Sequence, residues 1–147
     1  MSQPNAGNAD HAVLTPANNR ADINVVEEAV LKALDRHGYP EASRFAVRLA
    51  LEEAQVNAFM HGHRGLPETE TVEVEFSVSP TQVVLTVTDK GPGFSPESVP
   101  DPTASENIEL PSGRGLMLIR SFMTEVRHEQ GGNRLVMRYE RPDPGQS

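Results

Sequence analysis

The stretch LALEEAQVNAFMHG, Leu49–Gly62, decides how the rest of this 147-residue chain is interpreted. In a helical projection of about 100° per residue, its polar side chains fall on two opposite stripes. The stripe that we expect to face solvent holds Arg48, Glu52, Gln55 and Phe59. The stripe that we expect to face inward holds Ala46, Ala50, Glu53, Asn57 and His61. Because a buried, unpaired carboxylate is costly and alanines leave space beside it, this pattern predicts a ligand pocket along the helix.

Composition narrows the class of protein. The formal net charge is −8, a sign that repels nucleic acid and anionic membranes, so we expect neither as a direct partner. There is no cysteine, which excludes disulfides and thiol chemistry. No apolar run approaches the roughly 20 residues of a membrane span, and the first residues lack the basic and apolar regions of a secretory signal. We therefore expect a cytoplasmic protein.

The order of the predicted elements indicates the fold. Residues 12–141 are expected to form one domain between disordered tails at 1–11 and 142–147. Hydrophobic periodicity predicts helices at residues 20–37, 41–61 and 115–122. It predicts strands at residues 12–14, 72–78, 83–88, 124–130 and 134–140, and a long loop at 95–112. Because the strands cluster, we expect an α/β (α+β) two-layer sandwich, with helices on one face of a mixed, largely antiparallel sheet.

A possible base-binding site follows the second strand of the predicted hairpin. Asp89 has the same parity as the apolar residues of that strand, so we expect it on the apolar side. A carboxylate there can accept a hydrogen bond from an exocyclic amine such as that of adenine. Gly91 and Gly93 allow the backbone to turn and to approach a flat ring closely. An ordinary turn after a strand has the same composition, so this pattern alone leaves both interpretations open.

A possible phosphate site precedes the third predicted helix. In Ser112–Leu116, SGRGL, the glycines expose backbone N–H groups where the helix dipole favours an anion. Arg114 adds a positive charge. A flexible loop end with a solvated arginine is the alternative.

Glu53 and Asn57 form the third possible site, one helical turn apart on the predicted inward face. An amide oxygen suits Mg²⁺, and a carboxylate one turn away can deprotonate a hydroxyl that attacks a γ-phosphate. A buried polar pair satisfied by the backbone is the alternative. His61 and His63 have poor spacing for zinc, so we expect His61 to line the pocket or to cap the helix end.

Taken in order, these three patterns resemble the nucleotide-binding motifs of the GHKL ATPases, over roughly residues 12–140. Glu53-x-x-x-Asn57 is similar to their N box, Asp89–Phe94 (DKGPGF) to their G1 box and Gly113–Leu116 (GRGL) to their G2 box. Within that group, Pro111–Val126, PSGRGLMLIRSFMTEV, resembles the anti-sigma factor and serine-protein kinase family of the RsbW type.

The resemblance implies the Bergerat fold, with ATP and Mg²⁺ bound between the helices and a lid. It implies that Asn57 holds Mg²⁺, that Glu53 is the catalytic base and that Asp89 binds the adenine amine. The residues implied to line the base pocket are Gly91 and Gly93, and those implied to lie by the phosphates are Gly113, Arg114, Gly115 and Leu116. Pro111 stands where some family members have an arginine that faces the γ-phosphate.

The implied function is that of an ATP-binding anti-sigma factor and serine-protein kinase. Such a protein phosphorylates an anti-anti-sigma partner of the STAS type and sequesters a sigma factor, regulating transcription, and its relatives suggest a homodimer. Three alternatives are a nucleotide-binding switch without phosphoryl transfer, the ATPase half of a split histidine kinase, and an interaction protein without nucleotide. The second lacks room for a dimerisation helix pair before Arg20, and the inward Glu53 and Asn57 disfavour the third.

Overall fold

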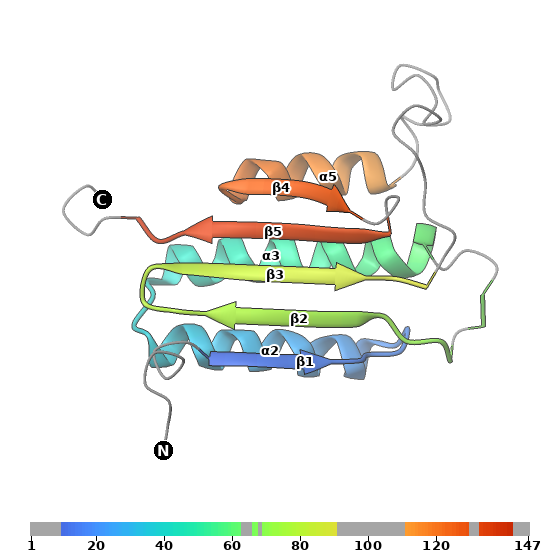
Figure 1. The fold of residues 1–147 in the computed structure, drawn as a ribbon, viewed down its shortest axis with the longest axis horizontal. Helices are drawn as coiled ribbons and strands as arrows, with labels where there is room; N and C mark the ends of the chain where they lie inside the picture. Colours follow the sequence, from blue (N-terminus) through green and yellow to red (C-terminus); the bar gives the residue numbers. More distant parts are fainter. Residues whose placement is uncertain (1–9, 63–65, 68, 91–110, 130–132, 143–147) are drawn as a thin grey trace.

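Three helices cover one face of a five-stranded sheet (Figure 1). The computed structural model describes residues 10–62, 66–67, 69–90, 111–129 and 133–142. The helices are α2 (Arg20–Arg36), α3 (Glu41–Asn57) and α5 (Pro111–Phe122), and a π-helical turn, η1 (Ala58–Gly62), follows α3 directly. The strands are β1 (Asp10–Leu14), β2 (Glu73–Val78), β3 (Gln82–Thr88), β4 (Glu125–Glu129) and β5 (Arg134–Glu140). The predicted two-layer α+β architecture is confirmed.

The strand order in the sheet is β1-β2-β3-β5-β4. Every adjacent pair among these five strands is antiparallel, so the parallel component expected of a mixed sheet is not found among them. Leu85 in the central strand lies opposite Phe76 on β2 and Met137 on β5, and all three side chains are buried. Alternate residues such as Glu73 and Glu75 are exposed, which is the period of two that predicted these strands.

The helices are amphipathic, and their buried stripes meet the sheet in one core. On α2, the buried apolar residues are Ile23, Val26, Val30, Ala33 and Leu34, as the periodicity predicts. Asn19 caps the start of α2 by accepting a hydrogen bond from the Asp22 N–H at 2.8 Å. Within the described residues, no helix has both the length and the apolar character needed to cross a bilayer.

The turn between α2 and α3 is stabilised by contacts with Arg141, a residue near the C-terminus. Gly38 adopts a left-handed conformation with φ of 70°, which a residue with a side chain rarely takes. Arg141, just beyond β5, donates hydrogen bonds of 2.7 Å to the carbonyls of both His37 and Gly38. Its guanidinium also lies 4.5 Å from the centre of the Tyr39 ring. These contacts fix the angle at which α3 leaves α2.

Three element boundaries differ from the predicted ones by more than one residue. The first strand begins at Asp10, inside the segment predicted as a tail. The helix predicted over 41–61 is α-helical only to Asn57 and then widens into η1. The helix predicted to start at Gly115 starts at Pro111 instead, because proline is well suited to the first turn, where its missing N–H has no partner to lose. Most of the predicted loop, 95–110, and both chain ends lie outside the described residues.

Candidate functional site

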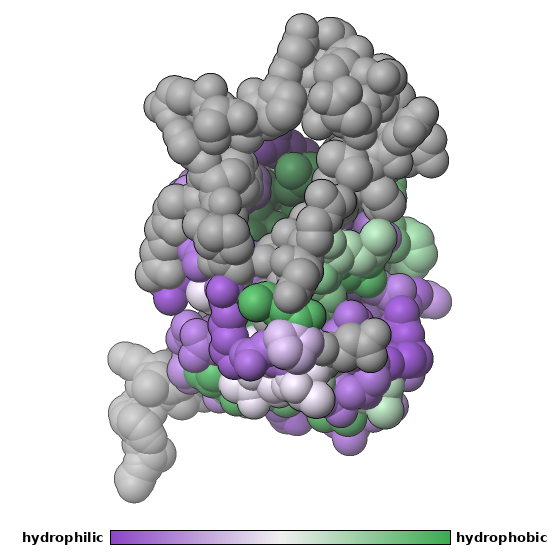
Figure 2. Space-filling model, turned by 90° about the vertical axis from the view of Figure 1, so that its right-hand side faces the viewer, coloured by the Kyte–Doolittle hydropathy of each residue, from purple (hydrophilic) through white to green (hydrophobic). Residues whose placement is uncertain are grey.

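The segments that carry the described candidate residues lie at one end of the molecule, where α3 and β3 end and α5 begins (Figure 1). Phe45, near the start of α3, packs edge-on against Phe122 at the end of α5, with ring centroids 5.9 Å apart. This contact aligns the two helices antiparallel, so the first turn of α5 lies beside the last turn of α3. Figure 2 looks onto this end and shows apolar side chains exposed among hydrophilic ones.

The side chain of Asn57 lacks the hydrogen bonds that a buried amide normally forms. Its side-chain oxygen and nitrogen are both buried, and neither has a hydrogen-bond partner among the described residues. Buried amides nearly always find partners, so an orphaned one in a native fold requires an explanation. The observation fits a group that awaits an external ligand, and the amide oxygen suits Mg²⁺. No backbone group of the described residues satisfies this side chain, contrary to the alternative.

Glu53 lies one turn before Asn57 on α3. Its side chain is half-buried and forms no hydrogen bond or ion pair with any residue that the structure describes. A carboxylate in this state keeps its lone pairs available to accept a proton from a hydroxyl. The last turn of α3 therefore presents a free carboxylate and an orphaned amide about 6 Å apart along the helix axis.

Asp89 lies one residue beyond β3 and is half-buried. Its backbone is tied to the start of β5, because its N–H donates to the Asn133 carbonyl at 2.9 Å and the Asn133 amide donates to the Asp89 carbonyl at 3.2 Å. We did not predict this role for Asn133, since in the sequence it looks like an ordinary hairpin residue after two glycines. Lys90 donates to Glu70 at 3.1 Å on the exposed surface.

The structure places only part of the predicted phosphate and base sites. Gly91 and Gly93 lie outside the described residues, as do the side chains of His61 and Arg114. The segment Gly113–Gly115 occupies the third to fifth positions of α5 rather than a loop before the helix, which corrects the prediction. Leu116 packs against the core that contains Ile119 and Met123. The backbone N–H groups of the first helical turn still lack intrahelical partners, so the N-terminus of α5 can still bind an anion.

The stripe of α3 and η1 predicted to face solvent does so only in part, since Arg48 is exposed and Glu52 is half-buried. Gln55 is 0 % exposed and Phe59 is 5 % exposed, so this prediction was wrong for both residues. The polar members of the stripe reach across to α2, where Arg20 Nη2 lies 3.2 Å from Glu52 Oε2 and Arg48 Nη1 lies 4.0 Å from Glu27 Oε1. A polar stripe on one helix can thus mark contact with the polar flank of a neighbour rather than with water.

Glu27 is a buried carboxyl at this helix pair that sequence reasoning missed. It is 6 % exposed, and its Oε2 has no hydrogen-bond partner in the described part of the chain. Burial, followed by a hydrogen bond to Glu52 and the charge of Glu52, raises its pKa to about 7, against the opposing charges of Arg20 and Arg48. Position 27 lies between Ile23 and Val30 on the buried stripe of α2, which is the signal that could have identified it.

We predict that Glu27 makes the free energy of unfolding fall as pH rises between about 5 and 8. Its carboxyl has a pKa of about 7 when folded, against 4.5 as the ordinary value, so the folded state holds a proton that the unfolded chain releases. This contribution is complete below pH 4.5 and is lost as pH passes 7. Urea unfolding of Glu27→Gln at pH 5 and pH 8 is expected to show a smaller difference than wild type.

Glu28→Gln is the matched control, because Glu28 is the exposed neighbour on the same helix. Titration of Glu52 is not expected to contribute to the difference in stability between pH 5 and pH 8. Burial opposes its charge, but the hydrogen bonds from Arg20 and Glu27 outweigh burial and lower its pKa, so it titrates below the pH range tested. An unchanged pH dependence in Glu27→Gln would show that Glu27 does not hold the proton.

Comparison with known protein families identifies the family to which this chain belongs. Residues 15–139 match the family described as the histidine kinase-like ATPase domain. The chain belongs to this family. The matched region contains Glu53, Asn57, Asp89 and Gly113–Leu116, and the resemblance to the GHKL ATPases drawn from these residues is confirmed at the level of the family.

Two curated relatives carry a functional name. The histidine kinase-like ATPase domain described here is 33 % identical over 82 residues to the anti-sigma F factor of Bacillus cytotoxicus, covering 54 % of this chain and 56 % of that one. It is 31 % identical over 83 residues to the anti-sigma F factor of Pasteuria penetrans, covering 55 % of each chain. The match thus spans about half the length of these relatives, and they support the RsbW-type resemblance.

Known structures share the fold. The RsbU and RsbW domains of Rv1364c from Mycobacterium tuberculosis align with a TM-score of 0.61 at 16 % identity, over 90 % of this chain and 33 % of that chain. The SiaB–SiaC complex from Pseudomonas aeruginosa aligns with a TM-score of 0.60 at 13 % identity, over 88 % of both chains. At these identities the likeness establishes the three-dimensional arrangement of the ATPase domain and not its partners.

Proposed function

We propose that this domain binds ATP with Mg²⁺ and transfers the γ-phosphate to a serine of an anti-anti-sigma partner of the STAS type. The observation that carries the proposal is the orphaned Asn57 amide, which needs an external ligand, beside the unpaired Glu53 carboxylate. Asn57 would hold Mg²⁺, which neutralises phosphate charge when bound. Membership of a kinase-like ATPase family supports ATP as the nucleotide.

The proposed chemistry assigns one role to each described residue. Glu53 takes the proton from the serine hydroxyl, the serine oxygen bonds to the γ-phosphorus, and the bond from that phosphorus to the bridging oxygen of ADP breaks. Asp89 accepts a hydrogen bond from the adenine amine, and the first turn of α5 contributes N–H groups toward phosphate. The proposal extends these roles to Gly91, Gly93, Gly113, Arg114, Gly115 and Leu116, and places His61 at the pocket wall.

We further propose that the domain sequesters a sigma factor in the cytoplasm and acts as a homodimer, with the unphosphorylated STAS partner displacing the sigma factor. The names of the two curated relatives support the anti-sigma role. A second candidate is a nucleotide-dependent switch without phosphoryl transfer. Pro111 favours this candidate, since it starts α5 at the position where some family members carry an arginine for the γ-phosphate.

A thermal-unfolding titration with ATP, ADP and GTP, each with and without Mg²⁺, tests nucleotide binding first. We expect ATP and ADP to raise the melting temperature in the presence of Mg²⁺, with about 2.7 kcal/mol of stabilisation at 100 times Kd, and GTP to have no effect. Equal stabilisation by GTP would contradict the role of Asp89 in selecting adenine. No stabilisation by any nucleotide would overturn the proposal.

A further inference from the structure

Strand β1 forms an open edge of the sheet that lies alongside α2. β2 pairs with one side of β1, and no strand that the structure describes pairs with the other. Asp10, Ala12 and Leu14 point toward the helix layer, since they lie opposite the buried residues Val78, Phe76 and Val74. At the start of β1, Asp10 Oδ2 lies 3.1 Å from both Arg36 Nε and His37 Nε2, which ties the strand to the end of α2.

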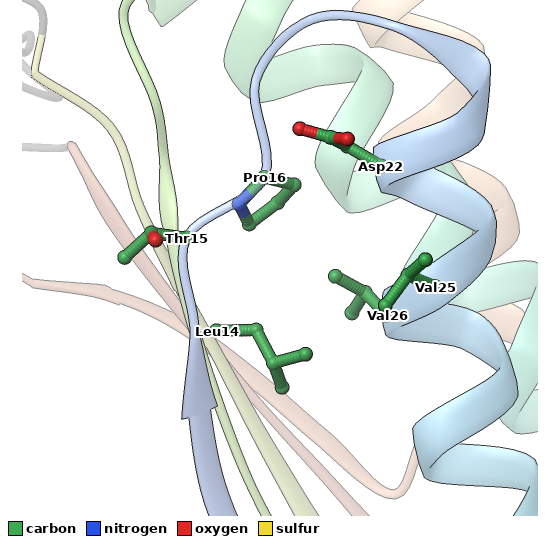
Figure 3. Close-up of a pocket in the computed structure, with 6 residues that line it drawn as sticks. All are labelled: Leu14, Thr15, Pro16, Asp22, Val25 and Val26. Carbon is green, nitrogen blue, oxygen red and sulfur yellow. The ribbon is translucent and has the colours of Figure 1, made fainter.

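A pocket opens at the other end of this edge. It lies between Leu14, Thr15 and Pro16 on the strand side and Asp22, Val25 and Val26 on α2, with a volume of about 130 Å³ (Figure 3). The Asp22 carboxylate already accepts the Ala17 N–H at 2.9 Å, so the groups left to meet a ligand are mainly apolar. Val25 is 57 % exposed although it lines the pocket. In volume the pocket is close to the roughly 150 Å³ cavity that accepts benzene in another protein, so a leucine-sized side chain fits.

The flank of α2 that overlooks this edge changes from apolar to basic along its length. Its residues, spaced three and four apart, are Asp22, Val25, Ala29, Lys32 and Arg36. Lys32 is exposed, and it lies about 10 Å along the helix from Val25, with Arg36 about 16 Å away. Arg36 Nε already pairs with Asp10 Oδ2 at 3.1 Å, so Lys32 is the main group at this basic end for an acidic partner.

We propose that this edge binds an extended segment of a partner protein as a sixth strand beside β1. A branched apolar side chain of that segment fills the pocket beside Val25, and a carboxylate four residues away lies beside Lys32. Side chains that face the helix layer recur every second residue, and four residues of strand span about 13 Å, which fits the spacing of the pocket and the basic end. Backbone hydrogen bonds to the open edge supply affinity, and the two side chains supply specificity.

This proposal is independent of nucleotide binding. None of Glu53, Asn57 and Asp89 lines the pocket. The β1 edge can therefore bind its partner even if the chain binds no ATP.

Two acetylated and amidated heptapeptides serve as probes, TLTTTET and TETTTLT, which present the same spacing in the two strand directions. We expect one of them to shift the backbone amide NMR signals of β1, Val25 and Val26 in the ¹⁵N-labelled full chain. Replacing its leucine with serine is expected to weaken binding at least about tenfold, because the lost burial is worth more than one factor of ten.

Val25→Glu tests the pocket, and Val13→Glu is its matched control. Both valines are about half exposed, but Val13 is on the opposite face of β1. We expect Val25→Glu to weaken peptide binding at least about tenfold and Val13→Glu to change it by less than about twofold. In Lys32→Glu, a peptide with lysine in place of glutamate is expected to become the tighter ligand by about two- to fivefold.

Two results would overturn the proposal. Neither peptide shifting the β1 signals at millimolar concentration would show that the edge does not accept a strand. The same signals broadening with protein concentration in the absence of peptide would show that a second copy of the chain occupies the edge instead.

Discussion

Glu53→Gln is expected to lower phosphoryl transfer about 10²- to 10⁴-fold while leaving ATP affinity unchanged. Glu53 is half-buried and makes no contact with the described residues that would be lost on neutralisation, so the fold does not depend on its charge. As the proposed base, it acts only when the serine hydroxyl loses its proton. The loss is therefore expected in the rate constant for transfer and not in nucleotide binding.

The measurement is single-turnover transfer of labelled phosphate to a purified STAS protein that the wild type phosphorylates. Glu52→Gln is the control, because Glu52 is adjacent in sequence but contacts Arg20 on α2. We expect Glu52→Gln to alter stability and to retain transfer. Transfer by Glu53→Gln at the wild-type rate would remove Glu53 from the mechanism. If the wild type phosphorylates no STAS protein but is stabilised by ATP, the nucleotide-dependent switch is the function.

Asn57→Leu is expected to have opposite effects on the free protein and on its complex. The buried amide has no partner among the described residues, and leaving such a group unsatisfied costs about 1–3 kcal/mol. Leucine has a similar size without that cost, so the free variant is expected to be as stable as wild type or more stable. The same change removes the proposed Mg²⁺ ligand, so the Mg²⁺-dependent part of the stabilisation by ATP is expected to disappear.

Thermal unfolding with and without ATP and Mg²⁺ measures both effects in one experiment. Asn24→Leu is the matched control, because the exposed Asn24 only accepts a hydrogen bond from Arg20 at 3.2 Å. That control is expected to bring no gain in stability and to retain the full effect of ATP. A destabilised Asn57→Leu that still responds to Mg²⁺ would mean that the amide is structural.

Periodicity predicted most of the helices and strands well, because most of these elements have one main buried side. On β2 and β3, the period of two identified the buried side chains, from Val74 to Val87, without knowledge of the partners. The same reasoning failed on the flank of α3. Gln55 and Phe59 have polar neighbours on their stripe, yet both are buried, and Glu52 on the same stripe pairs with Arg20 of α2. A helix in a layer of helices has neighbours on its flanks as well as beneath it, and its own sequence does not identify them.

Sequence spacing predicted the relative positions of candidate site residues where these lie on the same helix. Glu53 and Asn57 are on one helix, so spacing alone placed them one turn apart. Asn133 and Glu27 were missed because each acts on a residue distant in the chain, Asn133 on Asp89 and Glu27 on Glu52. The widening of the helix into η1 after Asn57 was also missed, since a π-helical turn has no sequence pattern that separates it from a continuing α-helix.

β3 and β5 pair in the sheet although a long stretch of chain connects them. Thr88 and Arg134 are partners in the sheet although they are 46 residues apart, and the stretch from Lys90 to Pro111 lies within that interval. The entropy of closing a loop grows only with the logarithm of its length, so ten residues added to the 20 between Lys90 and Pro111 would cost about 0.4 kcal/mol. A longer or shorter stretch at this place would therefore change the free energy of folding very little.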